Sequence, residues 1–135
     1  MLRKKTIARR GLLIAAATGV LTAGVRLQHD LYISDVCPDI GFLPVCGIVL
    51  VSHMAILGYG AWFPRAPKAL FYVGGFPALV FPVLGSFREL RSPNFCQSTL
   101  HSSVPDCFVL GSVAVLVVLC FVWMNSSASR PSQAR

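Results

Sequence analysis

Four long apolar segments constrain what this chain can fold into more than any other feature of its sequence. The clearest is CFVLGSVAVLVVLCFVWM, at residues 107–124. The other three cover residues 46–63, 69–87 and about 11–31, and the last of these runs past an internal arginine to gain length. A helix needs about 20 residues to cross the hydrocarbon core of a bilayer. We therefore expect four transmembrane helices in a single domain that covers residues 1–135.

Helices explain these segments better than strands, because apolar runs of this length exceed a buried strand. Hydrophobic residues make up 55% of the chain and charged residues 13%, whereas charged residues are about a quarter of an ordinary soluble domain. The formal charge of +7 does not indicate nucleic-acid binding, since that needs a basic patch on a folded surface and the charges here lie between apolar segments. The sequence predicts an all-α integral membrane four-helix bundle in contact with the lipid bilayer.

Basic residues are concentrated on one side of the predicted membrane. Nine of the twelve lie before the first segment, between the second and third, or after the fourth: Arg3, Lys4, Lys5, Arg9, Arg10, Arg65, Lys68, Arg130 and Arg135. Short loops rich in lysine and arginine stay in the cytoplasm. We therefore expect both termini to be cytoplasmic, with outer loops at about residues 32–45 and 88–106. Trp62 and Trp123 then fall at cytoplasmic helix ends, as expected of interfacial tryptophans.

The first segment also has an alternative interpretation. RRGLLIAAATGVLTAG follows a basic start and resembles a signal peptide of the twin-arginine or the ordinary type. Cleavage would leave three helices and an external N-terminus. No clean A-x-A cleavage site follows the segment, so we prefer the four-helix arrangement.

Four of the five cysteines fall in the predicted outer loops, as two pairs. Cys37 and Cys46 enclose CPDIGFLPVC, and Cys96 and Cys107 enclose CQSTLHSSVPDC. Disulfides persist outside the cytoplasm. Four cysteines allow three connectivities, and we expect the pairing within each loop because it closes the smallest rings. Cys120 lies deep in the fourth segment and is expected to be a small packing residue.

One cysteine of each pair is expected at the beginning of a helix. Cys46 and Cys107 each follow a proline by two residues, Pro44 and Pro105, and proline discourages helix before it. Unpaired amide groups in the first turn of a helix stabilise a thiolate, which is both the nucleophile and a good leaving group in disulfide exchange. The other interpretation is that both disulfides only hold the outer loops of a small bundle together.

Two outer loops, each with a cysteine pair that leads into the second or the fourth of four helices, resemble the membrane thiol oxidoreductases of the DsbB type, with the vitamin K epoxide reductases as broader relatives. The spacings C-x8-C and C-x10-C stand here where the family has C-x-x-C. The resemblance implies a bacterial inner membrane protein that passes electrons from a soluble extracytoplasmic thiol protein through two disulfides to a quinone. By position, it implies that Cys37 and Cys46 are the quinone-side pair, and that Cys96 and Cys107 meet the partner.

Two ionisable residues near the predicted outer end are candidates for cofactor binding. His53 lies seven residues after Cys46 on the same helical face, and an ionisable residue within a membrane is a functional candidate. It would hydrogen-bond a quinone carbonyl or relay a proton, unless it only bonds a carbonyl of a neighbouring helix. Arg26 would stabilise a thiolate or a quinone anion, unless it only extends to the membrane interface.

Two classes of function therefore agree with the sequence. The first is a membrane thiol-disulfide oxidoreductase. The second is a non-catalytic integral membrane protein, or an accessory subunit of a membrane complex, with structural disulfides. Metal chemistry is not expected, because His29, His53 and His101 lack the spacing of metal ligands.

Glycines in the middle segments predict how the helices pack. Small residues let the backbones of membrane helices approach closely. We expect this role for Gly58, Gly60, Gly74 and Gly75.

Overall fold

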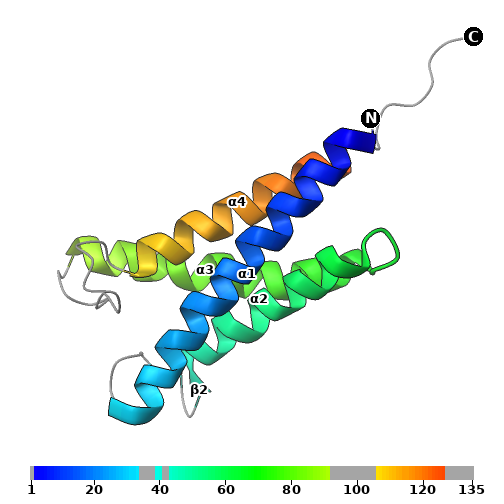
Figure 1. Ribbon diagram of the computed structural model, residues 1–135. Helices are drawn as coiled ribbons and strands as arrows, with labels where there is room; N and C mark the ends of the chain where they lie inside the picture. The colour runs from blue at the N-terminus through cyan, green and yellow to red at the C-terminus, as the bar shows by residue number, and fades with distance from the viewer. Residues whose placement is uncertain (1, 34–38, 41–42, 92–105, 127–135) are drawn as a thin grey trace, which may run out of the picture.

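The computed structural model describes residues 2–33, 39–40, 43–91 and 106–126 (Figure 1). Within these ranges the chain forms four helices, and each is long and apolar enough to cross a membrane. They are α1 (Leu2–Ile33), α2 (Val45–Trp62), α3 (Lys68–Arg91) and α4 (Asp106–Ser126). The prediction of a helical protein with four potential membrane spans is confirmed.

The helices form a bundle in which each one runs antiparallel to the next (Figure 1). α1 packs against α2 and α4, and α3 packs against the same two helices from the other side. α1 begins and α4 ends at one end of the bundle, which we call the terminal end. α2 and α4 both begin at the opposite end, which we call the loop end. The chain therefore brings the beginnings of the two cysteine-bearing helices to the same end of the bundle.

The ends of the elements differ from the predicted ranges. α1 begins at Leu2 rather than near residue 11, because lysine and arginine are good helix formers and the basic stretch continues the helix. α3 continues to Arg91. Two short strands before α2, β1 (Asp39–Ile40) and β2 (Leu43–Pro44), pair antiparallel within the range predicted as the first outer loop.

Arg9 connects the beginning of α1 to the end of α2. Its Nε donates a hydrogen bond to the carbonyl oxygen of Gly60 at 2.8 Å, and one terminal nitrogen donates to the carbonyl oxygen of Ala61 at 2.7 Å. The last carbonyls of a helix have no partner within the helix, and a cation there also interacts favourably with the helix dipole. The arginine pair that resembles a signal motif thus includes a residue that caps another helix.

The core lies between the helices and is completed by α1. Leu12, Ile56 and Val117 are buried side chains contributed by three different helices. Near the terminal end, the rings of Phe71 and Phe121 stack with centroids 3.7 Å apart, and Tyr59 packs against both. Since α1 supplies core residues and the Arg9 cap, it is an integral part of this bundle.

Two of the four predicted packing glycines lie where helices approach closely. A Cβ atom on Gly74 would lie 2.6 Å from the backbone oxygen of Ser52 in α2, and one on Gly60 would lie 2.6 Å from Leu12 in α1. A Cβ on Gly58 or Gly75 would first meet a side chain of its own helix. The prediction therefore holds for Gly60 and Gly74.

Large apolar side chains are exposed on all four helices. Examples are Leu21 on α1, Val51 on α2, Phe76 on α3 and Leu119 on α4. A soluble monomer rarely exposes contiguous apolar surface of this kind, whereas a bilayer solvates it. The outer surface of the bundle is therefore compatible with contact with lipid, and the protein has the form of a multi-pass membrane protein.

Candidate functional site

Cys46 and Cys107 occupy equivalent positions in the bundle. Each is the second residue of its helix, α2 or α4, and each is half-buried. Pro44 precedes α2 in an extended conformation and supplies no capping side chain. Both helices begin at the loop end (Figure 1). The amide groups of the first turn of α2 are therefore not capped by the side chain of Pro44.

The partner cysteines lie outside the described residues. Cys37 falls in residues 34–38 and Cys96 in residues 92–105, two of the ranges that the structure does not describe. The expected pairing within each loop therefore stays a prediction. Cys120 is a free thiol in the second half of α4, and a Cβ on Gly11 of α1 would lie 3.2 Å from its sulfur. This position agrees with the packing role expected for Cys120.

His53 is enclosed in the middle of the bundle. Its side chain is 0% exposed, and Nδ1 lies 2.9 Å from the carbonyl oxygen of Val49, one turn earlier in the same helix. A carbonyl accepts only, so Nδ1 carries the proton and Nε2 is left as an acceptor. Nε2 is buried and has no hydrogen-bond partner among the described residues. The carbonyl that bonds His53 thus belongs to its own helix, and not to a neighbouring one.

α1 covers the imidazole ring of His53. A Cβ atom on Gly19 would overlap this ring, so the backbone of α1 lies directly against it. His53 is also seven residues from Cys46, a rise of about 10 Å along an α-helix. With the helices in these positions, the ring of a quinone has no access to His53.

Arg26 faces the interior of the bundle, and only 5% of its surface is exposed. It continues the buried stripe of α1 that includes Leu12, Ala16 and Ala23. Its neighbour Leu27 lies beside Gly47, whose Cβ would be 3.9 Å from it, so Arg26 is level with the first turn of α2. Arg26 therefore points into the bundle and does not extend to the membrane interface. Its guanidinium group is enclosed by the helices, as the imidazole of His53 is.

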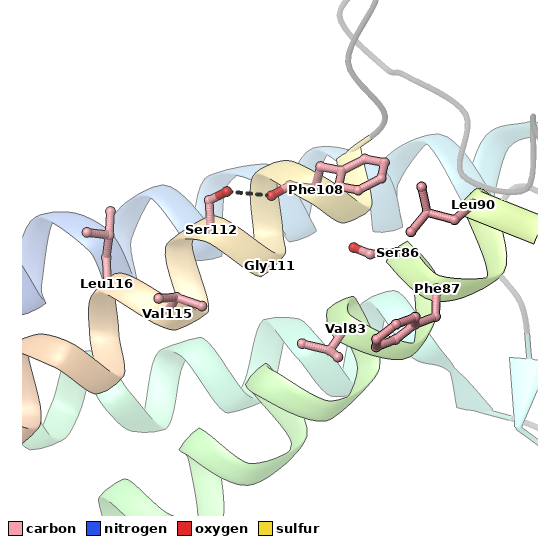
Figure 2. Close-up of a pocket in the computed structure, with 9 residues that line it drawn as sticks. All are labelled: Val83, Ser86, Phe87, Leu90, Phe108, Gly111, Ser112, Val115 and Leu116. Carbon is pink, nitrogen blue, oxygen red and sulfur yellow. Dashed lines mark hydrogen bonds between the residues drawn. The ribbon is translucent and has the colours of Figure 1, made fainter.

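A groove between α3 and α4 was not predicted. It has a volume of about 590 Å³ and lies on the loop-end halves of the two helices (Figure 2). Its apolar walls include Val83, Phe87 and Leu90 of α3 and Phe108, Val115 and Leu116 of α4. Phe108 directly follows Cys107. The groove therefore begins next to one of the two candidate cysteines.

The described part of the chain contains no cluster of three or more histidine, cysteine or acidic residues that could hold a metal ion. His29 lies in the last two turns of α1 and His53 in the middle of α2, while His101 lies outside the described residues.

The fold defines the class of this protein as a helical multi-pass membrane protein. In comparisons with known proteins, no family, curated protein or solved structure matches the chain. An activity therefore has to be argued from the cysteines and their surroundings.

Proposed function

We propose that this protein is a membrane thiol-disulfide oxidoreductase that relays electrons from external thiols through its two cysteine pairs. The observation that carries the proposal is the shared position of Cys46 and Cys107. Both are half-buried, both lie in the first turn of a helix, and both helices begin at the same end of the bundle. Cys37 and Cys96 are their proposed partners.

The chemistry is two successive thiol-disulfide exchanges. A thiolate of the external dithiol attacks Cys96, forms a mixed disulfide and releases the thiolate of Cys107. The second thiol of the dithiol then attacks the mixed disulfide, so the external protein leaves oxidised and the Cys96–Cys107 pair is left as two thiols. This pair reduces the Cys37–Cys46 pair by the same two steps. The first turn of a helix stabilises a thiolate, so Cys46 and Cys107 are the better leaving groups.

We propose that Arg26 assists the Cys37–Cys46 pair. It is buried at the level of the first turn of α2, where a positive charge stabilises a thiolate released at Cys46. For the final electron acceptor, the resemblance to the DsbB type implies a quinone dissolved in the membrane. His53 and Arg26 are enclosed and do not fit a quinone ring as the helices lie, so we assign no quinone site to them.

The relay requires the loop end to face the outside of the cell. The basic residues support this orientation, because Arg10, Arg65 and Lys68 belong to the terminal end or to the adjacent connection, and the side rich in such residues stays in the cytoplasm. A reporter fused after Arg135 should read as cytoplasmic, and a tag inserted at residues 98–103 should read as external. An external C-terminus would contradict the orientation.

The enclosed positions of His53 and Arg26 favour a second candidate function. In this alternative the protein is a non-catalytic membrane protein or an accessory subunit, and its disulfides only hold the outer loops together. Its buried polar residues then need no access to a cofactor.

A redox titration in membranes distinguishes the two candidates. Catalytic disulfides have potentials of about −120 to −270 mV, and structural ones usually lie below about −300 mV. The membrane-embedded protein is equilibrated with glutathione or dithiothreitol at a series of potentials, labelled with a maleimide and digested for mass spectrometry. We expect Cys37, Cys46, Cys96 and Cys107 to become labelled at potentials within the catalytic range. Cys120 is a free thiol, so it should be labelled at every potential when the protein is unfolded before the maleimide is added. Labelling of Cys120 alone would support the structural role.

A further inference from the structure

We propose that the groove between α3 and α4 is a binding site for one acyl chain of a membrane phospholipid. The groove lies on the loop-end half of the bundle, between the part of α3 after Pro82 and the beginning of α4 (Figure 2). This inference is independent of the thiol chemistry, because no cysteine is among the lining residues.

The walls show where an occupant must come from. Phe87, Leu90, Val115 and Leu116 line the groove and are also 48–71% exposed on the outside of the bundle. The groove is therefore continuous with the apolar surface that contacts lipid. Its volume of about 590 Å³ lies in the range of ligand sites, about 300–1,000 Å³. A molecule that enters it laterally from a bilayer meets no polar barrier at these four residues.

The two hydroxyl groups of the groove show what the occupant does not need. Ser86 Oγ donates a hydrogen bond to the carbonyl oxygen of Pro82 at 2.8 Å, and Ser112 Oγ donates to that of Phe108 at 2.9 Å. A hydroxyl has one proton to donate, so neither serine among these lining residues has a donor left for a ligand. The carbonyls of a quinone or the oxygens of a head group would lack a donor here. A hydrocarbon chain requires none.

Gly111 leaves the floor of the groove open. A Cβ atom at this position would lie 3.7 Å from Ser86 Oγ, an ordinary contact, so alanine fits and a longer side chain extends into the groove. Empty space beside apolar side chains forfeits their dispersion contacts. An acyl chain restores these contacts along both helices, which is why a phospholipid of the adjacent leaflet fits this groove.

Photo-labelling tests the site. The purified full-length protein is reconstituted with a phosphatidylcholine that carries a diazirine in the middle of one acyl chain, irradiated and digested for mass spectrometry. We expect labels concentrated on the α3 and α4 peptides that line the groove. In Gly111→Leu the added side chain fills the groove, so labelling should fall to the level of the remaining lipid-facing surface. Gly111→Ala is the matched control and should keep the wild-type labelling.

Ser112→Leu provides a second variant if Gly111→Leu does not fold, because Ser112 is exposed at the groove and leucine there blocks it from the lipid side. Equal labelling of wild type and the folded blocking variant would overturn the proposal, as would uniform labelling of all four helices. Loss of the label on addition of decyl-ubiquinone at a concentration equal to that of the lipid probe would also overturn it, and would indicate a quinone site. Thiol oxidation is not used as a readout, so the outcome does not depend on the redox proposal.

Discussion

Gly74→Ala tests how closely α2 and α3 pack. In the structure, the added methyl group would lie 2.6 Å from the backbone oxygen of Ser52 and 3.0 Å from the Cβ of Ala55. An ordinary contact begins at 3.4 Å, so the backbones must separate by about 0.8 Å, which is 3.4 minus 2.6. A backbone oxygen within a helix cannot rotate away as the end of a side chain can. The helices themselves therefore have to move.

The cost of this movement follows from the contacts that it weakens. A gap of about 0.5–1 Å forfeits a quarter to a half of the dispersion energy of each contact, and overpacking of a core costs about 1–3 kcal/mol. Alanine has a better helix propensity than glycine by up to about 1 kcal/mol. Because a helix backbone has to move, we take the upper end of the overpacking range, about 3 kcal/mol. After the offset of about 1 kcal/mol, we expect Gly74→Ala to lower the free energy of unfolding by about 2 kcal/mol.

The free thiol of Cys120 gives an assay for this prediction. Cys120 is half-buried against α1, so a fluorogenic maleimide in detergent micelles reports thermal unfolding. With a shift of roughly 4 °C per kcal/mol for a chain of this size, the midpoint of Gly74→Ala should fall by about 8 °C. Gly58→Ala is the control, because its methyl group would meet Trp62 and Leu70 only at 3.9 and 4.0 Å, and its midpoint should be unchanged or higher. Equal midpoints for the two variants would refute the close approach of α2 and α3 at Gly74.

Two further predictions use the same thermal assay. Gly19→Ala places a methyl group on the imidazole of His53 and should lower the free energy of unfolding by about 1–3 kcal/mol. In a His53→Ala background the same substitution should cost little, because the imidazole is absent. Additive effects of the two substitutions would contradict the contact. Arg9→Met removes two hydrogen bonds to carbonyls at the end of α2 and should cost about 1–3 kcal/mol. Arg10→Met, at an exposed position, is its control, and equal effects of the two arginine substitutions would argue against the cap.

Hydropathy located the helices because the length of an apolar run is a local property of the chain. The capping of α2 by Arg9 could not be predicted from the sequence. The charge of Arg9 predicts a cytoplasmic position whether or not the side chain caps α2. The hydrogen-bond partner of His53 could have been predicted, because Val49 precedes His53 by one helical turn. Close packing at Gly74 was predicted from residue size alone.

The groove and the direction of Arg26 depend on how helices are placed relative to one another. VLGSV around Gly111 reads as part of a continuous apolar segment, and only the position of α3 turns the missing side chain into the floor of a groove. For Arg26, the sequence left open a role beside a thiolate or quinone anion and extension to the membrane interface, because it does not show which face of α1 meets α2. The structure places it in the buried stripe.

Oxidation of an external dithiol by membranes that contain this protein is the decisive measurement for the proposed thiol relay. The measurement compares the rate for wild type, Cys46→Ser, Cys107→Ser and the control Cys120→Ser, all at equal protein level. We expect Cys120→Ser to keep the wild-type rate and both Cys46→Ser and Cys107→Ser to lose the activity. When the external thiol protein is instead supplied in its disulfide form, the free thiolate of Cys96 in Cys107→Ser attacks that disulfide, and a mixed disulfide between Cys96 and the external protein should accumulate. Oxidation at the wild-type rate by both Cys46→Ser and Cys107→Ser would rule out the relay and leave a membrane bundle without a redox function.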